Sequence, residues 1–129
     1  MERALLIALG GALGTLLRYF TSVAAARWLG ADFPHGTLIV NLCGSFAIGL
    51  VQQLGTEALV ISDDLRFFLT TGLLGGLTTY SAFSYETVRL MELGAWPQAW
   101  INIVVTTALC VGLCFLGLSV GRVLVAPRG

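Results

Sequence analysis

Four apolar runs, each long enough to cross a lipid bilayer, limit what this chain can fold into. A spanning helix needs about 20 residues, because each residue adds about 1.5 Å and the hydrocarbon core is about 30 Å thick. Short joins that contain glycine, proline or acidic residues separate the runs. We therefore expect one all-α transmembrane domain over residues 1–129, with spans at residues 4–29, 36–54, 65–93 and 96–125.

The composition agrees with a membrane protein. Hydrophobic residues make up 57% of the chain and charged residues 11%, whereas about 25% of a soluble domain is charged. This small number of charged residues cannot cover a water-facing surface. Membrane lipid is therefore an expected partner, and nucleic acid is not. We expect a multi-pass protein of the inner (plasma) membrane. A cleaved signal peptide over the first run is less favoured, because three further apolar runs follow it.

Polar and small residues recur at every fourth position in the second and fourth runs, which places them along one slowly drifting face of each helix. Such stripes commonly allow close helix packing. Two stripes in one small membrane protein also favour a wet path, because polar groups inside a bilayer usually face a cavity or another helix. The second run contributes Thr37, Asn41, Ser45 and Gly49, and the fourth contributes Asn102, Thr106, Cys110 and Cys114.

The third run contains two adjacent glycines, Gly75 and Gly76, and soon afterwards two adjacent threonines, Thr78 and Thr79. Both residue types weaken a continuous helix. Non-helical backbone at membrane depth is tolerated only against protein or a water-filled cavity. We therefore predict a break in this helix between Gly75 and Thr79, whose freed carbonyl oxygens could coordinate a cation.

Aromatic and polar side chains follow the predicted break. Tyr80 and Phe83 are three residues apart, and Ser81 lies between them. Packing is the usual role of such a pair, but positively polarised ring edges can also attract an anion weakly. Ser81 and Asn41 could then donate hydrogen bonds in place of lost water. Glu86 would repel an anion directly, so it either orients hydroxyl groups along the path or is solvated at the interface.

The first run contains an arginine that either of two roles can explain. Arg18 lies about 21 Å along a helix that begins near Ala4. It either extends to the far interface or attracts anions into a vestibule. In the same run, Gly10 and Gly14 have the spacing that favours close helix contact.

Motif blocks in a fixed order carry a resemblance to a known family. They are Gly10-Gly11-Ala12-Leu13-Gly14 with Arg18, Gly36-Thr37-Leu38-Ile39-Val40-Asn41 with Gly44-Ser45-Phe46, and Gly75-Gly76-Leu77-Thr78-Thr79-Tyr80-Ser81-Ala82-Phe83-Ser84 with Glu86. In a four-helix chain of this length, these blocks resemble the Fluc/CrcB family of fluoride ion channels. The match extends over nearly the whole chain.

The resemblance implies an antiparallel, dual-topology homodimer with two pores that passively exports fluoride and rejects chloride. It implies a central structural sodium ion, held here by the backbone carbonyls of Gly75 and Thr78. Arg18 would belong to the vestibule. The ion pathway would comprise Asn41, Tyr80, Ser81, Phe83, Glu86, Asn102, Thr106, Cys110 and Cys114.

The sequence departs from the usual family pattern along the expected pathway. Tyr80 stands where the family usually has Phe, and Ala82 stands where Thr is common. Asn102, Cys110 and Cys114 replace the Tyr, Ser and Thr often found there. Conduction is therefore expected to be slower than in relatives.

Other functional classes fit less well. A four-helix multidrug exporter would need an acidic residue in its first span, where this chain has Arg18. An assembly subunit would not explain a broken third helix beside polar groups. An enzyme is not expected, because His35 is the only histidine and no nucleophile or cofactor motif accompanies it. Since four helices cannot enclose a pore with these stripes on separate faces, we expect an obligate dimer.

Overall fold

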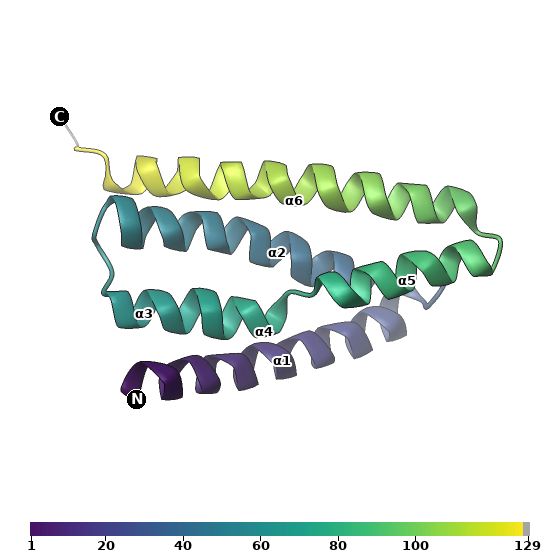
Figure 1. The fold of residues 1–129 in the computed structure, drawn as a ribbon. Helices are drawn as coiled ribbons and strands as arrows, with labels where there is room; N and C mark the ends of the chain where they lie inside the picture. Colours follow the sequence, from purple (N-terminus) through teal and green to yellow (C-terminus); the bar gives the residue numbers. More distant parts are fainter. Residues whose placement is uncertain (128–129) are drawn as a thin grey trace.

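The structure, a computed structural model, describes residues 1–127. Within this range it is entirely helical and contains no strand, which confirms the expected all-α class. The helical elements form four rods that lie alongside one another, with both chain ends at the same end of the molecule (Figure 1). The rods are α1 (Glu2–Leu29), α2 (His35–Gln52) with the π-helical η1 (Gln53–Glu57), the composite third rod, and α6 (Trp96–Val125). The third rod contains α3 (Asp63–Phe67), the π-helical η2 (Phe68–Leu74), α4 (Gly75–Leu77) and α5 (Tyr80–Glu92).

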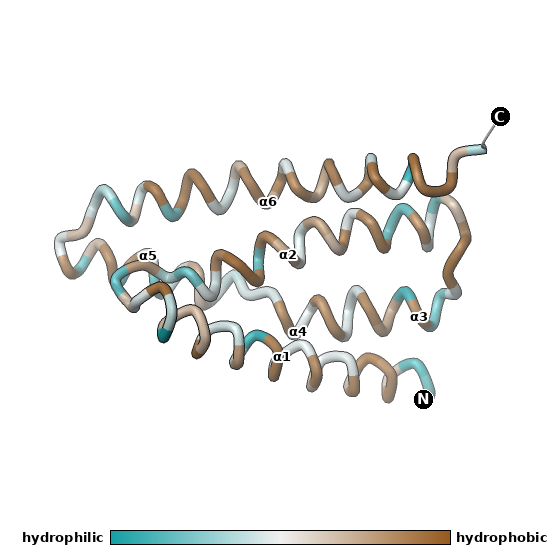
Figure 2. Tube along the Cα trace, turned by 180° about the vertical axis from the view of Figure 1, so that it is seen from behind, coloured by the Kyte–Doolittle hydropathy of each residue, from teal (hydrophilic) through white to brown (hydrophobic). Residues whose placement is uncertain are grey.

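Three of the four rods have the length and hydropathy of membrane spans. Within residues 1–127 these are Glu2–Leu29, His35–Glu57 and Trp96–Val125. Large apolar side chains such as Leu13, Phe20 and Phe115 are exposed on α1 and α6, as expected where lipid replaces water. Hydrophobic residues continue along α6, whereas hydrophilic residues gather around α5 (Figure 2). The chain is therefore a multi-pass membrane protein whose third rod is its least apolar part.

The third helix is broken, as the sequence predicted. Helix α4 ends at Leu77, and Thr78 (φ −86°, ψ 155°) and Thr79 (φ −153°, ψ 120°) are extended before α5 begins at Tyr80. The break is narrower than the predicted interval, because Gly75 and Gly76 remain helical. A Cβ on Gly76 would lie 3.0 Å from the backbone nitrogen of Thr15 in α1. This glycine therefore permits close packing, and the threonines provide the unwound backbone.

Glycines hold α1 against the third rod. A Cβ on Gly10 would lie 2.9 Å from the backbone nitrogen of Leu73, and one on Gly14 would lie 2.8 Å from that of Leu77. Each glycine thus lets two helix backbones approach more closely than any side chain would allow. The close contact expected from Gly10 and Gly14 is confirmed.

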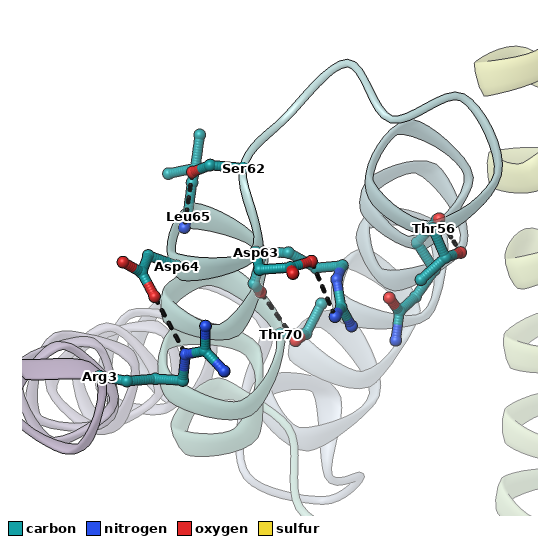
Figure 3. A network of polar contacts seen from close by, with 9 residues as sticks. Arg3, Thr56, Ser62, Asp63, Asp64, Leu65 and Thr70 are labelled. Carbon is teal, nitrogen blue, oxygen red and sulfur yellow. Dashed lines mark hydrogen bonds and ion pairs between the residues drawn. The ribbon is translucent and has the colours of Figure 1, made fainter.

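Polar contacts join the first and third rods at the end that carries the termini (Figure 3). Ser62 caps α3 by accepting a hydrogen bond from the backbone N–H of Leu65, at 3.2 Å. Arg3 of α1 donates to Asp64 of α3, with 3.0 Å between Nε and Oδ1. Because both side chains of this ion pair are about half exposed, it stabilises the fold by at most about 1 kcal/mol. The contact mainly fixes where α3 begins relative to α1.

Candidate functional site

A groove beside the break is the main candidate site. It encloses about 420 Å³ and is lined by residues of α2, η2, α4, α5 and α6. None of the described residues that line it is charged. An ion in the groove would therefore interact with dipoles, hydroxyl groups and ring edges. Of the predicted site residues, those that line it are Asn41, Gly75, Thr78, Tyr80, Phe83, Thr106 and Cys110.

Asn41 of α2 holds the unwound backbone in place. Its Oδ1 accepts a hydrogen bond from the backbone N–H of Thr79 at 2.9 Å, and its Nδ2 donates to the carbonyl oxygen of Thr79 at 3.1 Å. The side chain of Asn41 is 9% exposed. One amide thus replaces both hydrogen-bond partners that a continuous helix would have given Thr79. Polar backbone groups inside a membrane require such partners, because no water is present to bond with them.

Thr79 also begins the helix that carries the aromatic pair. Its Oγ1 accepts a hydrogen bond from the backbone N–H of Ala82 at 3.1 Å, which is an N-cap of α5. The Oγ atoms of Thr79 and Ser81 are 3.3 Å apart, and either can be the donor. Ser81 is exposed and does not line the groove in this single chain. The break therefore positions α5, and Ser81 lies at its outer edge.

Arg18 reaches the break from α1. Its Nε donates to the carbonyl oxygen of Gly76 at 3.1 Å. The carbonyl groups at a helix C-terminus carry partial negative charge, so a guanidinium at the end of α4 is favourable there. Arg18 thus points toward the break instead of extending to the far membrane interface.

Two carbonyl oxygens at the break have no backbone donor. Thr79, whose N–H would bond to Gly75 in a continuous helix, bonds to Asn41 instead. Ala82, whose N–H would bond to Thr78, bonds to the Thr79 hydroxyl. Within residues 1–127, no other backbone N–H reaches the carbonyl oxygen of Gly75 or Thr78. Carbonyl oxygens of this kind are suitable ligands for a hard monovalent cation such as sodium.

The predicted aromatic pair is present in the groove. The ring centroids of Tyr80 and Phe83 are 5.6 Å apart, and the ring planes are tilted by 48°. Phe83 is 9% exposed, whereas Tyr80 is 80% exposed. Phe83 is therefore buried in the wall of the groove, and Tyr80 forms its outer edge.

Asn102 and Thr106 belong to a buried chain of hydrogen bonds between α5 and α6. Thr106 donates to Asn102 Oδ1 at 3.3 Å, Asn102 Nδ2 donates to Thr87 Oγ1 at 2.9 Å, and Thr87 donates to the Phe83 carbonyl at 2.7 Å. Asn102 is 2% exposed and does not line the groove. These hydrogen bonds connect α6 to the backbone of Phe83, so Asn102 affects the groove through α5.

Glu86 and Thr37 form a second polar contact, one helix turn beyond Phe83. Thr37 Oγ1 donates to Glu86 Oε1 at 2.9 Å. Within the described residues, the other carboxylate oxygen of Glu86 is buried without a partner. Both residues line a separate cavity of about 550 Å³ between the α1–α2 loop and α5. Glu86 therefore orients a hydroxyl group, one of the two roles considered for it, and lies outside the groove.

The two cysteines in the polar stripe of the fourth run have different surroundings. Cys110 lines the groove and is partly buried. Cys114 does not line it, and its backbone packs against Gly49 of α2. The structure thus gathers Asn41, Tyr80, Phe83, Thr106 and Cys110 at the groove, and leaves Ser81, Glu86, Asn102 and Cys114 at its margins.

Comparison with known proteins assigns the chain to a family. The profile described as CrcB-like protein, Camphor Resistance (CrcB), matches residues 5–118. The chain belongs to the CrcB family. The resemblance drawn from the sequence motifs is therefore confirmed, and so is the expectation that the chain is not an enzyme, because this is a family of ion channels.

Close relatives of this CrcB family member match over almost their whole length. The chain is 48% identical over 124 residues to a protein of Geobacter sp. (strain M21), which covers 96% of this chain and 100% of the relative. It is 47% identical over 124 residues to a protein of Citrifermentans bemidjiense, with the same coverage. It is 49% identical over 118 residues to a protein of Roseiflexus sp. (strain RS-1), covering 92% and 95%. All three relatives are named fluoride-specific ion channel FluC.

Three residues that hold the site together by hydrogen bonds were not singled out as pathway residues by sequence reasoning. Thr79 is the residue that Asn41 holds, Thr37 is the partner of Glu86, and Thr87 links Asn102 to Phe83. Thr37 was visible in the polar stripe, and Thr79 in the threonine pair. Thr87 gave no signal, because a single threonine in a helix commonly bonds to its own backbone.

Arg18→Gln is expected to lower both stability and conduction in this CrcB protein. It removes a charge-assisted hydrogen bond to Gly76, and such bonds contribute about 1.5–3 kcal/mol. The melting temperature in detergent, followed by size-exclusion chromatography after heating, measures the first effect, and ion flux in liposomes measures the second. Arg27→Gln is the matched control, because no side-chain hydrogen bond involves Arg27 within residues 1–127. Equal behaviour of the two variants would show that Arg18 does not support the break.

Proposed function

We propose that this chain forms a fluoride-selective channel that passively exports fluoride across the inner membrane. The observation that carries the proposal is the uncharged groove beside the unwound Thr78 and Thr79. A small, strongly hydrated anion can enter a membrane only where donors replace its water, and the groove offers hydroxyl groups and aromatic edges. Relatives up to 49% identical that are named fluoride-specific ion channels support the choice of fluoride.

We infer an antiparallel homodimer with two pores, and the open groove of a single chain supports it. The groove is open along one side, where Tyr80 is exposed, and Ser81 is exposed at its outer edge. Lipid against these groups would leave polar atoms without partners, which is costly in hydrocarbon. A second copy would cover them, and two copies of the groove would give two pores. Light scattering in detergent tests this, and a conducting monomer would contradict it.

A structural sodium ion would fit at the break. The carbonyl oxygens of Gly75 and Thr78 lack backbone donors, and unwound carbonyls are the usual sodium ligands in membrane proteins. Two such oxygens are too few for one ion, so an antiparallel copy would supply the rest at the centre of the dimer.

Removal of sodium is expected to destabilise the dimer, because an ion that binds only the folded protein adds stability that grows with the logarithm of its concentration above the Kd. Purified protein would be heated in about 150 mM sodium chloride, close to physiological ionic strength, and in the same concentration of N-methylglucamine chloride. The melting temperature should be higher in sodium by several degrees. Identical melting temperatures in the two salts would remove the sodium ion from the proposal.

The function itself is tested with purified protein in liposomes. Fluoride release is followed with a fluoride electrode, and chloride release is followed in parallel. Rapid release of fluoride with little chloride is expected, and protein-free liposomes serve as the control. Failure to release fluoride, or equal release of both halides, would contradict the proposed function.

A further inference from the structure

Many hydroxyl groups on the described helices donate a hydrogen bond within the chain. A serine or threonine inside a membrane helix commonly bonds to the carbonyl oxygen four residues earlier, because no water is present to accept the proton. The bond from Thr21 to the Leu17 carbonyl, at 2.7 Å, is an example. The other residues bonded in this way are Thr56, Thr70, Thr78, Ser84, Thr87 and Ser119.

Three hydroxyl groups that line the groove lack such a partner. Within residues 1–127, no hydrogen bond involves the side-chain oxygen of Ser45, Tyr80 or Thr107. They come from α2, α5 and α6, so three separate elements contribute hydroxyl-bearing residues to the lining of one cavity of about 420 Å³. The remaining threonines with side chains at this groove, such as Thr70 and Thr106, donate elsewhere.

We propose that Ser45, Tyr80 and Thr107 together form a fluoride-binding subsite, distinct from the Asn41 amide. This inference rests on the proposed function of the chain. Ser45 belongs to the stripe of the second run and to a motif block but was not assigned to the pathway, and neither was Thr107, so the subsite extends the predicted pathway.

Fluoride fits this donor set better than chloride does. Hydrogen bonds from hydroxyl groups to an anion are short and about twice as strong as those between neutral groups. Fluoride is the smaller halide, with its charge more concentrated, so it gains more from each O–H donor. None of the described residues lining the groove carries a charge, so binding stays weak enough for the ion to leave, as conduction requires. The phenol of Tyr80 thus adds a donor that a phenylalanine would lack.

Single-atom substitutions test the subsite with little change of shape. Each test variant removes one hydroxyl group that has no hydrogen-bond partner within the described residues. Each control makes the same substitution at another position. In two controls the hydroxyl group bonds to its own helix, and in the third it lies away from the groove. The test variants are S45A, Y80F and T107V, and their controls are S119A, Y85F and T21V.

The fluoride concentration that gives half-maximal efflux from liposomes should rise about threefold to tenfold in each test variant, which is the effect of losing one hydrogen bond. The preference for fluoride over chloride should fall in the same variants. The controls should stay within about twofold of the unsubstituted protein. Size-exclusion profiles of all variants establish that they are folded. Test variants that behave like their controls would overturn the subsite.

Fluoride binding to the detergent-purified protein separates this inference from the proposed function. The ¹⁹F NMR line of fluoride should broaden with the unsubstituted protein and much less with the combined variant S45A/Y80F/T107V. If the protein releases no fluoride from liposomes, the channel function fails, and the NMR titration still decides whether the subsite exists. Equal broadening by the two proteins would overturn the subsite even if the channel conducts.

Discussion

Asn41→Ala is expected to abolish fluoride release and to destabilise the protein, because one side chain satisfies both backbone groups of Thr79. Alanine would leave a buried N–H and a buried carbonyl without partners at membrane depth. Each unsatisfied group costs about 1–3 kcal/mol, so the free energy of unfolding should fall by about 2–6 kcal/mol. The melting temperature in detergent and the rate of fluoride release from liposomes measure the two effects.

Two further variants separate the contact with Thr79 from general loss of an amide. Asn41→Asp keeps the acceptor for the Thr79 N–H but faces its carbonyl with a carboxylate oxygen, so it should also lose fluoride release. Gln98→Ala removes an exposed amide from α6 and should leave both measurements unchanged. If Asn41→Ala behaved like Gln98→Ala, the break would not depend on the contact between α2 and Thr79.

Local features of the sequence predicted the outline of this fold. The lengths of the apolar runs predict the four rods, because run length depends only on residues within one segment. The threonine pair at Thr78 and Thr79 gives the break for the same reason. Gly75 and Gly76 were also expected to unwind, but they are helical because Gly76 packs against α1. That outcome depends on a neighbouring helix, which the local sequence does not describe.

The polar stripes were harder to interpret, because a four-residue repeat does not stay on one face. Each step of four residues turns the helix by about 40° beyond a full turn, so Thr37 and Gly49 differ by about 120°. Thr37 therefore meets Glu86 on α5, whereas Gly49 packs against Cys114 on α6. The sequence identified the stripe but not the drift that divides it between two neighbours.

Partners across helices could not be read from the sequence. The contact between Asn41 and Thr79 joins residues 38 positions apart, and the contact between Thr37 and Glu86 joins residues 49 apart. The two π-helical segments, η1 and η2, were likewise not predicted. An inserted residue in a helix turn has no compositional signature, since it depends on packing around the helix.

Gly14→Ala is expected to prevent most of the protein from folding. The new Cβ would overlap the carbonyl oxygen of Leu73 and would lie 2.8 Å from the backbone nitrogen of Leu77. Both contacts are with backbone, so α1 would have to move away from η2 and α4. That movement would also draw Arg18 away from the Gly76 carbonyl. Overpacking of this kind costs about 1–3 kcal/mol or more.

The same substitution at Gly112 isolates the contribution of close packing. Alanine is favoured over glycine inside a helix by about 1 kcal/mol, so helix propensity alone would make both substitutions stabilising. Gly112 lies in α6, and a Cβ there would meet nothing within 4 Å. Gly112→Ala should therefore fold with an equal or higher melting temperature, while Gly14→Ala yields little monodisperse protein. Because only the surroundings differ, the gap between the two variants measures how strongly the α1 contact supports the broken helix; equal yields would mean that it does not.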